Sequence, residues 1–224
     1  MLVVIGLGTA LDGALAVFWQ EPLTAIVAAR AQHGLREEWA QREHDWAVRA
    51  PSRQALLRPS ASVPAAPVIA TPGRPRRPPP TARPRAGHAA AKLTIPRIGL
   101  RRIVVRGTSS SALRRGPGLY EELAWPGRGR VSAIAGHRTT WGAPFRRLDA
   151  LRAGDRIVLE LPGQVLRYRV QQTRVVDPGD RSVLEPGRGT TLVLTACDPP
   201  GSARHRIAVR AVLRQRVGRV VRPG

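Results

Sequence analysis

The chain contains one cysteine, Cys197, which follows the apolar run "TTLVLTA" and precedes the break "DPPG". A lone cysteine in an apolar strand is most often a small hydrophobic residue. Cys197 is expected at the very end of its strand, where the backbone is held rigidly and solvent can still reach the side chain. The thiol is therefore a candidate nucleophile, and a buried structural residue is the alternative.

A nucleophilic thiol needs a partner that takes up and returns a proton. His137 ends the apolar run "VSAIAGH" and so occupies the same place on its strand as Cys197 does. His205 neighbours Arg206 and is expected on the opposite face of its strand. His137 is the preferred base and His205 the weaker candidate, with a structural histidine as the alternative.

Acyl transfer also needs a group that stabilises the tetrahedral anion. Arg206 begins the apolar run after the "DPPG" break, and a hairpin between the two runs would bring its guanidinium beside Cys197. A guanidinium does not act as a base, but it donates planar, charge-assisted hydrogen bonds. Arg204 has the same parity on the strand and is the second candidate.

The elements that must position these residues are short and strand-like. Glycine and proline punctuate apolar segments from Lys92 onward, which predicts an all-β fold with a closed eight-stranded barrel. One short helix is predicted over "APFRRLDALRAGD", and the tail "RQRVGRVVRPG" is predicted to be frayed. The candidate strands are Leu93–Ile98, Ile103–Val105, Gly118–Tyr120, Val131–Gly136, Arg156–Leu161, Val165–Val176, Thr190–Ala196 and Arg206–Leu213.

Three further segments precede the predicted barrel domain, residues 92–224. Residues 1–19 are uncharged except for Asp12 and predict a transmembrane anchor; a cleaved signal peptide and a buried soluble helix are the alternatives. Residues 20–50 predict a solvated juxtamembrane helix. Residues 51–91 contain ten prolines and predict an extended linker, either a plain spacer or a tether lying on anionic polymer.

The formal net charge of +22 would attract any polyanion, although 36 of the 37 basic residues are arginine, as expected of a GC-rich genome. The sequence has no zinc-ligand spacing, RNA-binding aromatic motif or recognisable helix-turn-helix, so nucleic acid is not expected as a partner. A single cysteine excludes an intramolecular disulfide, and the five histidines are scattered. Neither a metal nor a cofactor is therefore expected.

The motifs "IAGHRTTWGAPFRRLDALRAGD" and "LTACDPPGSARHRIAV", with "KLTIPRIGLRRIVVRG" upstream, resemble the sortase transpeptidase family. The similarity runs over Lys92–Leu213 and is greatest to the class E sortases of high-GC Gram-positive bacteria. It implies a sortase-like β-barrel without a cofactor. In this sequence it implies His137 as the catalytic histidine, Cys197 as the nucleophile and Arg206 as the catalytic arginine.

The resemblance also implies an activity and a location. Such an enzyme is held in the cell membrane by a single span, with its catalytic domain on the extracellular side. It cleaves an LPxTG- or LAxTG-type sorting signal of a surface protein between Thr and Gly through a thioester, and it transfers the protein to a peptidoglycan precursor amine. The alternatives are a pilin-polymerising sortase and a non-catalytic, polyanion-binding wall protein on the same barrel.

The sequence departs from the family pattern at three positions. Ala196 replaces the threonine that usually precedes the cysteine, and Trp141 stands where class E sequences often have tyrosine. Asp198 replaces the histidine of a "CHP" motif, and its negative charge is expected to disfavour the thiolate of Cys197.

Overall fold

The computed structural model describes residues 2–50, 83–187 and 189–218, with the side chains of α1 described from Leu23 onward. The predicted anchor over residues 1–19 and most of the predicted linker therefore lie outside the fully described part. Within the part of the chain that is fully described, no helix is both long enough and apolar enough to span a bilayer.

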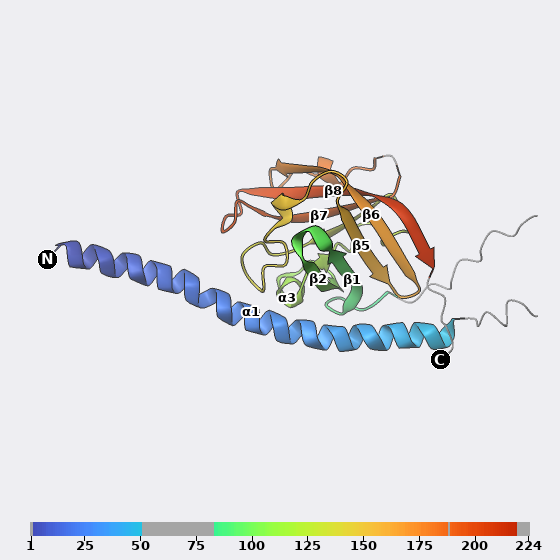
Figure 1. The fold of residues 1–224 in the computed structure, drawn as a ribbon, viewed down its shortest axis with the longest axis horizontal. Helices are drawn as coiled ribbons and strands as arrows, with labels where there is room; N and C mark the ends of the chain where they lie inside the picture. Colours follow the sequence, from blue (N-terminus) through green and yellow to red (C-terminus); the bar gives the residue numbers. More distant parts are fainter. Residues whose placement is uncertain (1, 51–82, 188, 219–224) are drawn as a thin grey trace, which may run out of the picture.

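The eight strands close into a barrel in the order β1-β2-β3-β4-β7-β8-β6-β5 (Figure 1). This confirms the predicted closed eight-stranded barrel with few, short helices in its connections. The strands are β1 (Ala89–Ile95), β2 (Leu100–Arg106), β3 (Gly118–Leu119), β4 (Val131–Ala135), β5 (Arg156–Leu161), β6 (Gln164–Val176), β7 (Thr191–Asp198) and β8 (His205–Gly218).

The barrel forms because its strands alternate between apolar and polar side chains. In β5 the inward residues Ile157, Leu159 and Leu161 are fully buried, whereas Arg156 is exposed. Successive side chains of a strand point to opposite faces, so this alternation fixes which face turns toward the barrel interior. Tyr168 of β6 fills the same interior, and burial raises its pKa well above the ordinary range.

The largest differences from the predicted strand boundaries are in β1, β2 and β8. β2 begins at Leu100, three residues earlier than expected. β1 begins at Ala89, and residues Pro96–Ile98 form the 3₁₀ turn η1 that the left-handed Gly99 ends. β8 continues to Gly218, which pairs with Gln164 of β6. The prediction of a frayed tail is therefore wrong for residues 214–218, because β6 is long enough to offer them a full antiparallel partner.

The predicted helix over residues 143–155 is also wrong. This segment folds as successive turns that end in the 3₁₀ turn η2 (Leu148–Ala150). Phe145, Leu148 and Leu151 are buried at a spacing of three residues, which matches the three-residue period of a 3₁₀ turn. A short helix that was not predicted, α3 (Ser110–Arg115), begins where Ser109 accepts a hydrogen bond from the Ala112 N–H.

The helix α1 (Leu2–Arg49) lies along one side of the barrel, against β1, β2 and α3 (Figure 1). Leu35 and Trp39 are buried in an apolar cluster with residues of these elements. Trp46 packs on Gly163 in the β5–β6 turn, where a Cβ atom would clash with the indole ring. The residue 20–50 segment is a helix, as predicted, but it is docked rather than solvated.

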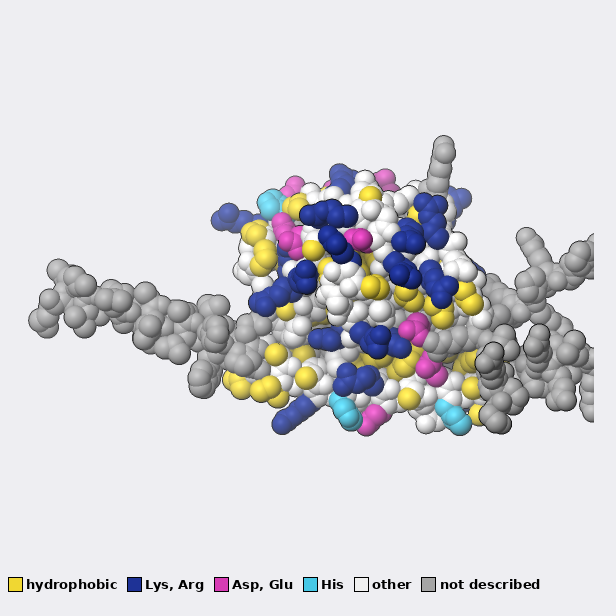
Figure 2. All heavy atoms as spheres, in the orientation of Figure 1, with side chains coloured by type: hydrophobic (Ala, Val, Ile, Leu, Met, Phe, Trp, Pro, Cys, Tyr) yellow, Lys and Arg dark blue, Asp and Glu magenta, His cyan; other side chains and the backbone are white. Residues whose placement is uncertain are grey.

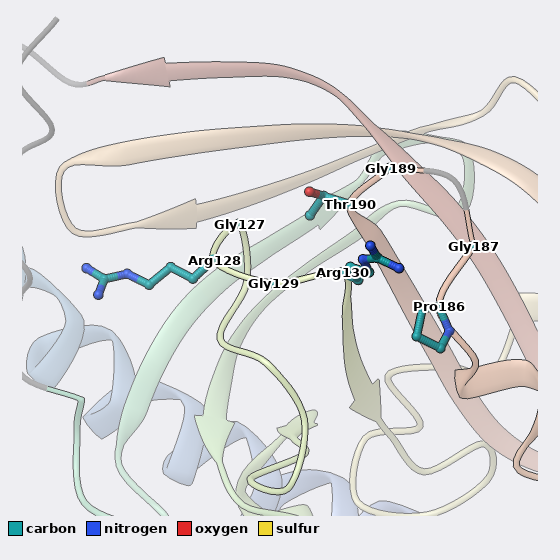
Figure 3. Close-up of a pocket in the computed structure, with 8 residues that line it drawn as sticks. All are labelled: Gly127, Arg128, Gly129, Arg130, Pro186, Gly187, Gly189 and Thr190. Atoms are coloured by element: carbon teal, nitrogen blue, oxygen red, sulfur yellow. The ribbon is translucent and has the colours of Figure 1, made fainter. Parts of the chain in front are cut away.

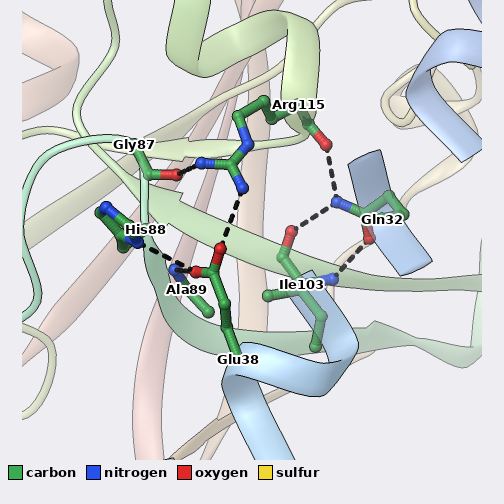
Figure 4. A network of polar contacts seen from close by, with 7 residues as sticks. All are labelled: Gln32, Glu38, Gly87, His88, Ala89, Ile103 and Arg115. Carbon is green, nitrogen blue, oxygen red and sulfur yellow. Dashed lines mark hydrogen bonds and ion pairs between the residues drawn. The ribbon is translucent and has the colours of Figure 1, made fainter. Parts of the chain in front are cut away.

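Two side chains of α1 bind backbone of the barrel domain (Figure 4). The Gln32 amide donates to the carbonyls of Ile103, at 3.0 Å, and Arg115, at 2.9 Å, and accepts from the Ile103 N–H at 2.9 Å. The Glu38 carboxylate accepts from the Ala89 N–H and from Arg115, both at 3.0 Å. Burial opposes ionisation of Glu38, but these hydrogen bonds and the Arg115 charge outweigh it and lower the pKa of Glu38.

Candidate active site

Cys197 and Arg206 are direct cross-strand partners in the antiparallel β7–β8 pair. Their strand neighbours Ala196 and Ile207 face the barrel core, so alternation places Cys197 and Arg206 on the outer face. The hairpin expected from the sequence is therefore present. Cys197 lies at the end of β7, and it is neither fully buried nor fully exposed.

His137 joins this face from β4, which runs parallel to β7 with Ala135 opposite Thr195. The Gly136 N–H donates to the Thr195 carbonyl at 3.0 Å, so the parallel register continues one residue past the strand. Two residues beyond the Ala135–Thr195 pair, the same register places His137 opposite Cys197. The structure thus gathers the three predicted residues at the adjoining ends of β4, β7 and β8.

The imidazole of His137 is half-buried, and its Nε2 atom has no hydrogen-bond partner among the described residues. Burial lowers the pKa of His137, and the charge of Arg114 on α3 lowers it further. At neutral pH the ring is therefore mainly neutral, which is the form that accepts a proton.

The other candidates are held elsewhere. His205 lies next to Arg206 on β8, so it points to the opposite face, where its Nδ1 atom is 3.2 Å from Asp177. Arg204 is exposed in the β7–β8 turn. The guanidinium of Arg206 donates to the carbonyls of Ala203, at 3.1 Å, and His205, at 3.0 Å, so it rests on the turn that precedes it.

The charge of Asp198 is neutralised by Arg138, a residue that the sequence analysis did not single out. Arg138 has a side chain only 4% exposed, and it forms an ion pair with the Asp198 carboxylate. Its second terminal nitrogen lies 3.3 Å from Asp149 of η2. The sequence analysis treated Asp198 as an isolated negative charge that disfavours the Cys197 thiolate. That expectation is wrong, because the charge is part of an ion pair with Arg138.

Ala196 faces the barrel core and is 3% exposed. The level position on β4 is Gly136, where a Cβ atom would clash with the Phe145 ring. The departure from the family pattern at Ala196 is thus a change in packing on the inner face. It adds or removes no group on the outer face, where Cys197 lies.

Trp141 connects the loop after His137 to α1 and α3. The Arg114 guanidinium stacks on the indole, 5.1 Å from the ring centre. The backbone N–H of Trp141 donates to the hydroxyl of Thr24 on α1 at 3.2 Å. Arg114 thus contacts Trp141, and its charge also lowers the pKa of His137.

Replacing Arg114 by glutamine is expected to raise the pKa of His137, because it removes a nearby positive charge while burial, the larger cause, remains. The titration of His137 followed by NMR should move to higher pH. Arg114→Lys keeps the charge and serves as the matched control. Identical titration of His137 in both variants would contradict the assignment.

A pocket of about 830 Å³ lies at the opposite ends of the same strands (Figure 3). Arg128 and Arg130 line it together with Gly187, Gly189 and Thr190, near the first residues of β4 and β7. Six residues of β7 separate this end from Cys197, about 20 Å at the usual rise of a strand. The pocket is therefore not part of the His137–Cys197 site.

A closed barrel that presents a cysteine, a histidine and an arginine on three adjoining strand ends has the layout of a cysteine acyl-transfer enzyme. The sortase domain model matches residues 93–214, and the chain belongs to the sortase family. This confirms the resemblance seen in the sequence.

Individual relatives agree with this placement. The chain is 32% identical to Sortase D of Bacillus subtilis over 118 residues, and 33% identical to Sortase SrtE1 of Streptomyces coelicolor over 139 residues. These matches cover 52% and 55% of this chain but 58% and 40% of the relatives, so the chain spans about half of their length. The solved sortase E of Streptomyces avermitilis superposes with a TM-score of 0.55 at 33% identity, covering 59% of this chain and 92% of that one. The similarities are consistent with a class E-like sortase.

Proposed function

We propose that the chain is a membrane-anchored cysteine transpeptidase that cleaves an LPxTG- or LAxTG-type sorting signal between Thr and Gly. The observation that carries the proposal is the register of three strands. Cys197 lies opposite Arg206 in β7–β8, and His137 follows the strand that runs parallel to β7.

In the first half of the reaction the neutral His137 takes the proton of the Cys197 thiol, and the sulfur attacks the threonine carbonyl carbon to form a tetrahedral anion. The Thr–Gly C–N bond then breaks, and His137 supplies the proton that the leaving glycine amine needs. A thioester between Cys197 and the threonine acyl group remains. Arg206 donates hydrogen bonds to the oxyanion, to the substrate backbone, or to both; acting on the oxyanion, it must exchange its bonds to the turn.

In the second half an amine of a peptidoglycan precursor attacks the thioester carbon. The C–S bond breaks, an amide forms, and His137 takes up the proton of the attacking amine. The neutral state of His137 that burial favours suits this step. The departing Cys197 thiolate then takes this proton from His137, so the thiol and the neutral imidazole are both restored without a cofactor.

The outer face of β4, β7 and β8, on which Cys197 lies, also carries apolar side chains. Val131, Ala133, Val193 and Ala208 form a buried cluster on this face of β4, β7 and β8. The partly buried side chains of Leu123, Val183 and Leu184 pack against the cluster. We expect the leucine of a sorting signal to contact Leu123, Val183 and Leu184, because the cluster beneath them is buried.

Two structures of similar proteins support this substrate class. One is described as Sortase E1 of Streptomyces coelicolor with a tripeptide in the active site, and another as Clostridium perfringens sortase C with the C-terminal cell wall sorting motif. Residues 1–19 would anchor the enzyme so that the barrel acts on the extracellular side. This location rests on the sequence of that segment.

The test is to incubate the full chain with LAxTG and LPxTG peptides and an amine acceptor such as triglycine. We expect cleavage at the Thr–Gly bond and a new amide to the acceptor, with LAxTG the better substrate. Cleavage of neither peptide, by a folded protein with a free thiol, would contradict the proposal.

The alternative of a non-catalytic polyanion-binding protein draws on the basic surface, which is evident in Figure 2 as Lys and Arg side chains spread over the barrel. Its other support was the change at Ala196 and Asp198. Ala196 lies in the core and Asp198 is paired with Arg138, so neither residue now argues against catalysis. We therefore favour the transpeptidase.

A further inference from the structure

The ion pair between Arg138 and Asp198 lies directly behind the proposed catalytic residues. Arg138 follows His137 in the chain, and Asp198 follows Cys197. Because β4 and β7 are parallel and in register, the two charged residues lie level with each other, as His137 and Cys197 do. The pair thus joins the same two chain segments that carry the proposed base and nucleophile.

The guanidinium of Arg138 is enclosed by three groups from two segments. One terminal nitrogen binds the Asp198 carboxylate and lies 3.5 Å from the Cys197 carbonyl oxygen, and the other contacts Asp149 at 3.3 Å. The side chain of Asp149 is 60% exposed, whereas that of Asp198 is 20% exposed. Asp198 is therefore the partner that compensates the buried charge, since an exposed partner is screened by water.

This arrangement acts on the backbone of Cys197 as well as on its electrostatic surroundings. The contact with the Cys197 carbonyl ties the nucleophile's own peptide group to the residue after His137. A displacement of about 1 Å between reacting groups costs a large factor in rate. A buried guanidinium that bridges the two strand ends resists such displacement.

We propose that the Arg138–Asp198 ion pair is a positioning device that sets Cys197 against His137 and cancels the field of Asp198 at the thiol. The proposal rests on the proposed transpeptidase function for its kinetic consequences only. The claim that the paired charges of Arg138 and Asp198 act on the Cys197 thiol can be tested without a substrate.

Two single variants should act on the thiol in opposite directions. Asp198→Asn leaves the Arg138 charge uncompensated, which favours the thiolate, so alkylation of Cys197 by iodoacetamide should reach half its maximal rate at lower pH. Arg138→Gln leaves the Asp198 charge uncompensated and should move this midpoint to higher pH. The double variant should return it close to the wild-type value. Other ionisable groups around these strand ends stay unchanged in these variants; they include His137, Arg206, His205, Asp177, Asp149 and Arg114.

Both single variants should also lower kcat for an LAxTG peptide by about tenfold or more, with KM within about twofold, because the geometry of the reacting groups is lost rather than peptide binding. Asp198→Glu keeps the charge and should restore most of kcat. Asp149→Asn removes a carboxylate from the same arginine at an exposed position, and it is the matched control expected to stay within about twofold.

All variants are to be measured in the full chain, with thermal unfolding as a check on folding. Opposite alkylation shifts together with the loss of kcat would support the proposal. Lowered melting temperatures with unchanged alkylation midpoints and kcat would overturn it and leave the pair a structural one. If the wild type cleaves no peptide, the proposed function fails, and the alkylation midpoints alone still decide whether the pair acts on the thiol.

Discussion

Replacing Cys197 by alanine is expected to lower kcat/KM for cleavage of a sorting-signal peptide by at least about 10⁴-fold, because a thioester requires a cysteine and the sequence contains only this one. Residual hydrolysis would come only from binding and from stabilisation of the anion by Arg206. The rate is measured as release of the glycine-containing fragment by the full chain, with LAxTG and LPxTG peptides.

The Cys197→Ala variant should remain folded, since Cys197 is only partly buried at the end of β7 and alanine fits any strand position. Cys197→Ser is the matched control for shape, and it should be nearly as inactive because a hydroxyl is a far weaker nucleophile than a thiolate. Activity retained in either variant would remove Cys197 from the mechanism.

Replacing Arg206 by alanine is expected to lower kcat by about 10²- to 10³-fold, the usual cost of losing one donor to a developing oxyanion. Arg206 lies directly opposite Cys197, and its guanidinium can reach the outer face from the start of β8. Arg206→Lys keeps the charge but loses the planar fork, so its kcat should fall between those of the wild type and the alanine variant.

Arg204→Ala provides the control for Arg206, since Arg204 is exposed in the adjacent turn and was the second candidate from the sequence. Its kcat should stay within about threefold of the wild type. A larger loss in Arg204→Ala than in Arg206→Ala would reverse the assignment. Because each variant removes one positive charge near the β7–β8 turn, a general effect of that charge on kcat would appear equally in both.

The strands and the site face could be predicted because both depend on local patterns. Alternating apolar residues and glycine or proline breaks located all eight strands, and "DPPG" located the hairpin that puts Cys197 opposite Arg206. His137 was found from the equivalence of two strand ends. Its catalytic role, like those of Cys197 and Arg206, stays a prediction.

The docking of α1 was missed although the sequence contains a signal for it. Ala28, Leu35, Trp39 and Trp46 are buried, and together with Gln32 they recur at intervals of three, four or seven residues along one helix face. That stripe is typical of a helix packed on another surface. Acid–base pairs at helical spacing, such as Glu38 and Arg42, favoured a solvated helix instead. Glu38 in fact binds Ala89 and Arg115 on the docked side.

The role of Asp198 was misjudged for a different reason. Its charge was weighed against the neighbouring thiol alone, whereas its partner Arg138 is 60 residues away in sequence. The two can be paired only when β4 and β7 are known to be parallel and in register. The parallel register also places His137 level with Cys197, so one topological fact determines both pairs.

The most direct test of the account is a search for the acyl-enzyme. The full chain is mixed with an excess of LAxTG peptide without an acceptor amine, quenched in acid and analysed by intact and peptide-level mass spectrometry. The account predicts a mass increase equal to the peptide's acyl part up to threonine, located on Cys197, removed by hydroxylamine and absent from Cys197→Ala. No adduct on the wild-type protein, or an adduct that persists in Cys197→Ala, would contradict it.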